Sequence, residues 1–157
     1  MMNDYFERVS NIIFAHDGTL DKYIGDAVMA LFGAPLGTDE DELQAVRAGF
    51  EMQQAVRDFN RERAMADQEQ IGIGIGIATA QVIAGYGGSS QTMSYTVIGD
   101  GVNLAARLCS AAGSGDVLLS PTTLGHVRNF VDAHEMDEMK LKGMADPVRP
   151  YRLIKML

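Results

Sequence analysis

The sequence of 157 residues contains no tryptophan and a single cysteine, Cys109. One cysteine excludes an internal disulfide and suits a reducing compartment, so we expect a cytoplasmic protein. Positive charge is scarce, because 13 Lys and Arg face 21 Asp and Glu, which gives a net charge of −8. This balance argues against a surface that binds nucleic acid or an anionic membrane. No apolar run approaches the roughly 18 residues of a membrane-spanning helix, so no membrane segment is expected in this chain.

The remaining composition is that of a soluble globular domain. Hydrophobic residues make up 46% of the chain and charged residues 22%. The length fits one domain with a hydrophobic core. We find no internal repeat, low-complexity segment or linker, and therefore expect a single domain over residues 1–157.

Hydrophobic periodicity and turn residues predict the element order α-β-β-α-β-β-α-β-α-β. In the first half of the chain we expect a helix at 3–15, two strands joined by a short turn within 16–33, a long helix over 38–64 and a strand pair within 71–88. A second set follows: a helix at 100–113, a strand at 116–120, a short helix that begins at Pro121 and a closing strand at 150–157. In the helix at 100–113, Asp100 is the expected N-cap, Val102–Ala112 the body and Gly113 the stop. This order predicts an α+β fold with the helices packed on one face of a sheet.

Isoleucine alternates with glycine in the stretch IGIGIGI, residues 71–77. The glycines do not form a phosphate-binding loop, because their order is G-x-G-x-G within a strand, no helix begins there, and no G-K-[ST] follows. Glycine at alternate positions of a strand instead indicates a face against which another element packs closely.

The stretch DKYIGDAVMALFGAP, residues 21–35, predicts a hairpin with Gly25-Asp26 at its turn. Asp26 places a carboxylate at the tip of this hairpin, and Lys22 lies four residues before it. Taken alone, the dipeptide is also typical of a turn aspartate that bonds its own backbone.

Two longer motifs give the chain a family resemblance. GTLDKYIGDAVMALFGAP, followed further along by YTVIGDGVNLAARL, resembles the catalytic domain of the class III nucleotidyl cyclases, the adenylate and guanylate cyclase family. GIATAQVIAGYGGS fits the family's central hairpin, and LKGMADPVRPYRL fits its C-terminal end. The resemblance covers nearly the whole chain and implies a ferredoxin-like sheet with helices on one face and with the family's first strand absent.

The resemblance also implies an activity. The family converts a nucleoside triphosphate to a 3′,5′-cyclic nucleotide by in-line attack of the ribose 3′-oxygen on the α-phosphorus, with pyrophosphate leaving. Two divalent cations per site, Mg²⁺ or Mn²⁺, support this chemistry. The sites form between two domains packed head to tail, so a homodimer through the catalytic cleft is implied.

Residue by residue, the resemblance assigns metal and purine contacts. Asp26 matches the family's second metal-binding aspartate, and carboxylate oxygens are ligands that Mg²⁺ prefers. Lys22 matches the position that reads the purine; an ammonium only donates, and adenine N1 is an acceptor whereas guanine N1 carries a hydrogen. Thr96 matches the second purine-reading position, with the backbone of Val97 beside it, so ATP is the implied substrate. The alternatives are an exposed strand lysine paired with Asp21 or Asp26, and an ordinary strand threonine.

Asn103 and Arg107 are four residues apart on the expected helix and so share a face. They match the family's pair that orients the ribose and stabilises charge on the α-phosphoryl oxygens, which suits a delocalised guanidinium. The alternative is a solvated pair on an amphipathic helix. In family dimers Lys22 and Asp26 would serve opposite active sites, although they are neighbours in sequence.

The sequence departs from the family pattern in three places. No aspartate matches the family's first metal ligand, which lies on a strand before the first helix. Gln91 and Met144 stand where many members have a basic residue, and Lys142 could replace the second of these. We interpret the chain as an N-terminally truncated version of a longer cyclase with an upstream regulatory domain, in which a second chain or a rearranged segment covers the gap.

Two functions therefore stay open from the sequence. One is an adenylate cyclase module that cyclises ATP. The other is a catalytically silent dimerisation or nucleotide-binding module, which the missing carboxylate favours. A guanylate-specific enzyme is disfavoured by Lys22.

Overall fold

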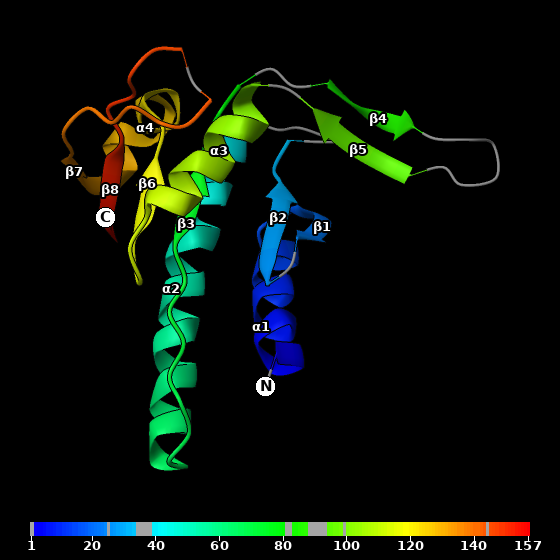
Figure 1. Cartoon of the computed structure of the whole chain (residues 1–157), viewed down its shortest axis with the longest axis vertical. Coiled ribbons are helices and arrows are strands. Elements are labelled where there is room, and N and C mark those ends of the chain that lie inside the picture. Colours follow the sequence, from blue (N-terminus) through cyan, green and yellow to red (C-terminus); the bar gives the residue numbers. More distant parts are fainter. Residues whose placement is uncertain are drawn as a thin grey trace.

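The computed structural model describes residues 2–24, 26–33, 39–80, 83–87, 94–98, 100–143 and 145–157, and of residues 2, 3, 24, 83–87, 94–98 and 100 it describes the backbone alone. The helices are α1 (Met2–Ala15), α2 (Asp41–Met65), α3 (Asp100–Ala111), α4 (Pro121–Val127) and the 3₁₀ helix η1 (Arg128–Phe130). The strands are β1 (Thr19–Ile24), β2 (Ala27–Leu31), β3 (Ile75–Ile77), β4 (Ile83–Gly87), β5 (Ser94–Ile98), β6 (Val117–Leu119), β7 (Val131–Glu135) and β8 (Tyr151–Met156) (Figure 1). None of the helices in these ranges has the length and apolar character needed to cross a bilayer.

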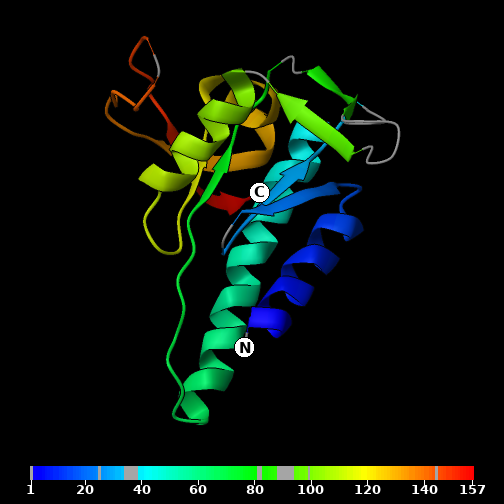
Figure 2. The same ribbon diagram turned by 45° about the vertical axis from the view of Figure 1, so that its right-hand side comes forward.

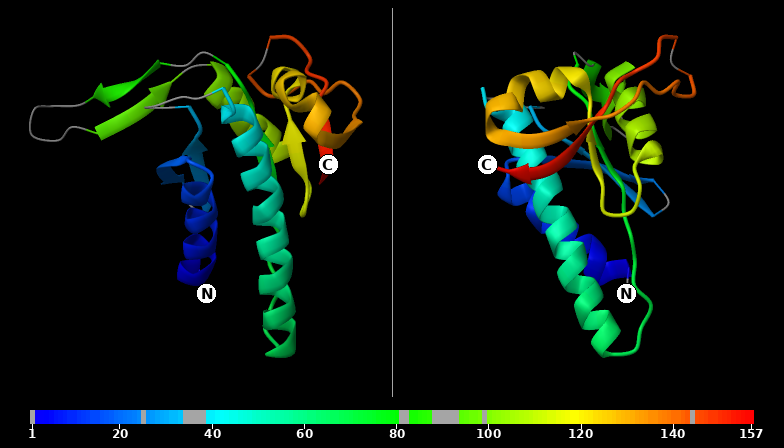
Figure 3. Two further views of the ribbon diagram at one scale, coloured as in Figure 1. Left: turned by 180° about the vertical axis from the view of Figure 1, so that it is seen from behind. Right: turned by 90° about the vertical axis from the view of Figure 1, so that its left-hand side faces the viewer.

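The strands of the described ranges form three sheets. β3, β6, β8 and β7 make a four-stranded sheet in that order, with β3 and β6 parallel and the other pairs antiparallel. β1 with β2 and β4 with β5 form antiparallel two-stranded sheets. The β4–β5 hairpin projects from the body of the molecule (Figures 1 and 3).

Pairing within residues 71–88 differs from the prediction. Both expected strands exist, but they do not pair with each other, since β3 pairs with β6 and β4 pairs with β5. β5 and β7 were also not expected. β3 and β6 run parallel, and parallel neighbours need a long crossover connection, which here contains β4, β5 and α3. β4 and β5 follow each other in the chain and pair antiparallel.

The α+β class is as predicted, but helices cover both faces of the four-stranded sheet. Val117 and Leu119 of β6 pack with α2 and α4 in one apolar cluster, and Leu118 between them packs with Leu108 of α3 in another. Successive strand residues point to opposite faces, and all three β6 side chains are buried. The expectation of helices on one face is therefore wrong for α3, because this strand is apolar on both sides.

The glycine face of β3 is covered by α3, as the sequence predicts. A Cβ atom on Gly76 would lie 2.4 Å from the backbone nitrogen of Cys109 and 2.5 Å from the carbonyl oxygen of Ala105, and one on Gly74 would lie 2.9 Å from the Ala112 Cβ. The Cys109 thiol donates to the Gly74 carbonyl oxygen at 3.3 Å, and burial raises its pKa. The missing side chains thus let the helix lie directly on the strand backbone.

The hairpin β1–β2 forms a sheet of its own. Val28 and Ala30 pack in the same apolar cluster as Ile71 and Ile73, which lead into β3. Within the described ranges no ladder of hydrogen bonds joins β2 to β3.

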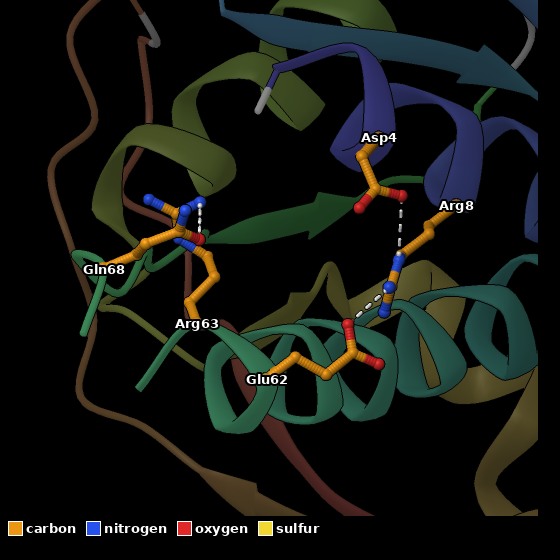
Figure 4. A network of polar contacts seen from close by, with 5 residues as sticks. All are labelled: Asp4, Arg8, Glu62, Arg63 and Gln68. Atoms are coloured by element: carbon orange, nitrogen blue, oxygen red, sulfur yellow. Dashed lines mark hydrogen bonds and ion pairs between the residues drawn. The ribbon is translucent and has the colours of Figure 1, made fainter. Parts of the chain in front are cut away.

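Helix α1 packs along α2 mainly through apolar side chains (Figure 2). At the surface Arg8 binds Asp4 at 3.2 Å and Glu62 at 2.7 Å, and its guanidinium lies 5.0 Å from the centre of the Phe59 ring (Figure 4). Exposed ion pairs contribute about 0–1 kcal/mol each. The buried cluster, which includes Val9, therefore holds the two helices together more than this network does.

The segment that follows α2 runs back along this helix to β3 (Figure 3). Two amide side chains of α2 hold it in place. Gln53 is buried, and its Nε2 donates to the carbonyl oxygens of Ile73 at 2.9 Å and Asp116 at 3.0 Å. Asn60 binds both the nitrogen and the oxygen of Ile71, at 2.8 Å and 2.6 Å. These bonds fix the position at which β3 enters the sheet.

Replacing Gln53 by alanine is expected to lower the free energy of unfolding by roughly 1–3 kcal/mol, because two part-buried hydrogen bonds are lost while each carbonyl oxygen keeps its backbone donor. Urea unfolding followed by circular dichroism measures the change. Gln54→Ala is the matched control, since Gln54 is exposed on the same helix. Equal effects of the two substitutions would contradict the role given to Gln53.

Candidate functional site

The β1–β2 hairpin carries two of the predicted site residues. Lys22 lies on β1 opposite Met29, and its side chain is 46% exposed. Its Nζ lies 3.6 Å from Oδ2 of Asp21. In the single chain Lys22 is therefore an exposed strand lysine paired with Asp21, as the alternative interpretation expects.

Asp26 is exposed at the end of the hairpin, just before β2. Burial raises the pKa of the Tyr5 phenol on α1, and the Asp26 carboxylate raises it further. Asp26 therefore acts electrostatically on a buried phenol that stays protonated.

The ligand chemistry of Asp26 fits a hard divalent cation as one oxygen donor. Mg²⁺ is commonly held by one or two carboxylates, with substrate phosphates and water completing the shell. Among the described residues no group of three or more His, Cys, Asp or Glu could hold a metal ion. Asp26 is thus a suitable single ligand, and the other donors would come from elsewhere.

Asn103 and Arg107 lie on α3, where Asn103 is exposed and Arg107 is half-buried. The Nη2 of Arg107 lies 3.8 Å from the position that a Cβ on Gly143 would take. Leu141, two residues before this glycine, is buried against Leu108. Residues 141–143 are therefore anchored beside the Arg107 guanidinium, and Lys142 among them is exposed.

Thr96 and Val97 lie on β5, opposite Gly85 and Ala84 of β4. Their side chains fall outside the part that the structure describes, as do residues Gln91 and Met144. Their assigned roles stay predictions.

A buried hydroxyl network, which sequence reasoning missed, lies at the root of the β4–β5 hairpin. Thr79 Oγ1 lies 2.8 Å from Thr123 Oγ1, which lies 2.9 Å from Ser120 Oγ. Ser120 also caps α4 by accepting from the Thr123 backbone N–H at 3.2 Å. The Ser-Pro sequence at the start of α4 predicts the cap. The contact with Thr79 depends on the fold, and it holds the chain in place shortly before β4 begins.

In the described part of the chain the predicted site residues of the hairpin and of α3 are not joined by polar contacts. Across the described ranges no hydrogen bond or ion pair links Lys22 or Asp26 to Asn103 or Arg107. One surface pocket, at the α1–α2 junction, is lined by Asp4, Phe59, Glu62, Arg63 and Gln68. A second is lined by residues around Asp116 and the β7–β8 end of the sheet. Neither pocket includes a predicted site residue.

Comparison with proteins of known sequence identifies the family. The model of the adenylate and guanylate cyclase catalytic domain matches residues 1–155. An adenylate cyclase of Anabaena cylindrica is 40% identical over 111 residues, which cover 68% of this chain and 21% of that protein. The chain spans about a quarter of the length of the curated relatives it matches.

Solved structures agree with this match. The adenylyl cyclase CyaB from P. aeruginosa superimposes with a TM-score of 0.93 and 30% identity over 98% of this chain and 80% of that chain. The guanylyl cyclase Cya2 gives a TM-score of 0.91 and 36% identity over 97% and 77%. The chain has the class III cyclase fold and belongs to the adenylate and guanylate cyclase catalytic domain family.

Proposed function

We propose that this chain is an adenylate cyclase catalytic domain, which converts ATP to 3′,5′-cyclic AMP and pyrophosphate at sites shared by two copies. The observation that carries the proposal is an exposed lysine, Lys22, on the same hairpin as the exposed carboxylate of Asp26. The family membership supports cyclase chemistry, and the lysine supports the choice of nucleotide.

The preference for ATP rests on hydrogen-bond polarity. The Lys22 ammonium can only donate, so it would pair with adenine N1 and meet an N–H on guanine. Thr96 would accept from the adenine amino group, with the Val97 backbone on the same edge. Similarity to the guanylyl cyclase Cya2 favours GTP as the rival substrate, and Lys22 argues against it.

The reaction assigns separate tasks to α3. Asn103 would orient the ribose so that its 3′-oxygen lies in line with the α-phosphorus. Arg107 would stabilise the negative charge that develops on the α-phosphoryl oxygens, which a delocalised guanidinium suits. Two Mg²⁺ or Mn²⁺ ions, one of them held by Asp26, would supply neutralisation of the phosphates.

Two features support a homodimer. Among the described residues no hydrogen bond or ion pair joins Asp26 to Asn103 or Arg107, which supports a site that takes Asp26 from one copy and the other two residues from its partner. The β4–β5 hairpin projects from the body (Figure 1), and an isolated two-stranded hairpin is marginally stable in water. In the proposed head-to-tail dimer, Lys22 and Asp26 of one copy would serve opposite sites.

The second carboxylate of the metal site is proposed to come from a further strand. The β1–β2 hairpin shares an apolar cluster with Ile71 and Ile73, which lead into β3, but no ladder of hydrogen bonds joins the two sheets within the described ranges. One strand between them would join the sheets. We propose that the parent protein contains this strand and an upstream regulatory domain, and that it is cytoplasmic. Among the described residues no cluster of carboxylates surrounds Asp26 as a metal site, which favours a silent nucleotide-binding module as the second candidate.

Cyclisation assays separate these functions. ATP and GTP are supplied with Mn²⁺ or Mg²⁺ to this chain and to one extended by a family strand with its aspartate. Production of cyclic AMP in preference to cyclic GMP supports the proposal. If only the extended chain is active, the second metal ligand is assigned to the added strand. Silence of both chains would favour the binding module.

Mixing two inactive variants is expected to restore activity if sites are shared. Asp26→Ala and Arg107→Ala, inactive alone, should give about a quarter of wild-type activity together, since half of the dimers are mixed and each has one intact site. Asn103→Ala mixed with Arg107→Ala is the control, because both residues come from one copy and no site is intact. Equal restoration in both mixtures would refute the proposed arrangement.

A further inference from the structure

A buried carboxylate lies beside the lysine to which the proposed function assigns the purine. The Asp21 side chain is 1% exposed. Within the described part of the chain neither of its oxygens accepts a hydrogen bond, and the Lys22 Nζ lies 3.6 Å from Oδ2. Burying a carboxylate without hydrogen bonds costs free energy. Folding alone therefore gives no reason for an aspartate at this position.

A β-bulge brings these two neighbours together. The ladder pairs Leu20 with Ala30 and Lys22 with Met29, so Asp21 is an extra residue without a partner on β2. In a regular strand successive side chains point to opposite faces, and Asp21 and Lys22 would be apart. A bulge interrupts that alternation and redirects a side chain, which is how their charges come within 3.6 Å.

The geometry points to Asp21 as a positioning residue that holds the Lys22 ammonium ready for the purine, an inference that rests on the proposed function. Asp21 is too buried to touch a base, so it acts through Lys22. A free lysine side chain loses rotamer entropy when it binds. The buried Asp21 carboxylate beside the ammonium orders the Lys22 side chain before the nucleotide binds, and so reduces the entropy lost on binding.

Asp21→Asn tests the inference, because it keeps the side chain's size and removes its charge. We expect the KM for ATP, and the Kd of a fluorescent ATP analogue, to rise roughly tenfold while kcat stays within about twofold. The constants for GTP and its analogue should not change, so the preference for ATP falls by the same factor. The Tm should stay equal or rise, since a neutral amide is less costly to bury.

Asp4→Asn is the matched control, because it removes an exposed carboxylate from a different basic partner, Arg8, and should leave both nucleotides unaffected. A fall in Tm with losses for ATP and GTP alike would show a merely structural role and overturn the inference. If the wild type is active and Asp21→Asn keeps the preference for ATP, the inference about Asp21 is overturned and the proposed function stands. A wild type that binds neither nucleotide overturns it together with the proposed function.

Discussion

Replacing Arg107 by alanine is expected to lower kcat for ATP cyclisation roughly a hundred- to a thousandfold, with a much smaller change in KM. The guanidinium would act on charge that appears in the transition state, so its loss affects turnover more than substrate binding. Steady-state kinetics of cyclic AMP formation, on whichever form of the chain is active, measure the effect.

Two further variants make this test specific. Arg107→Lys should remain at least about tenfold slower than wild type, because an ammonium cannot form the planar fork of a guanidinium. Arg57→Ala removes an exposed arginine of α2 and should leave kcat unchanged. If Arg107→Ala also left kcat unchanged, the solvated-helix alternative for this residue would be correct.

Gly76→Ala is expected to lower the free energy of unfolding by about 3 kcal/mol, at the upper end of overpacking costs. The new methyl group would lie 2.4 Å and 2.5 Å from backbone atoms of Cys109 and Ala105. Backbone atoms cannot move aside as a flexible side chain can, so α3 must shift as a whole. Chemical denaturation of the purified variant gives the change in stability.

The control for Gly76→Ala lies on α4. Gly125 has open space at the position that a Cβ would take and no positive φ, so Gly125→Ala should raise stability by about 0.4–1 kcal/mol through the unfolded state. A loss of stability at both glycines would show that substitution itself, and not contact with α3, is responsible. Opposite signs would support the close packing of α3 on β3.

Much of the fold is legible in local patterns. The turn Gly25-Asp26 with flanking apolar residues predicted the hairpin, Pro121 predicted the start of α4, and alternating glycines predicted a tightly covered strand face. Pairing across the chain was less predictable. β3 and β4 follow each other closely, yet they pair with β6 and β5. The parallel pair β3–β6 closes only across a long crossover, which local patterns do not reveal.

The candidate site shows the same division. Motif resemblance located Lys22, Asp26, Asn103 and Arg107 and placed them on the expected hairpin and helix. It could not single out Asp21, because DKYI reads as a regular strand and the extra residue depends on the register against β2. Nor could it connect Thr79 with Thr123, which are 44 residues apart and meet only in the folded chain.

Direct contact between α3 and the main chain of β3 has a mechanical consequence. Where side chains separate two elements, a change of rotamer can absorb a small displacement, but here the helix lies on peptide groups. Strand and helix must then translate as one body, without slack. A displacement of β3 at this edge of the sheet would therefore also displace α3 and Arg107, which lies on that helix.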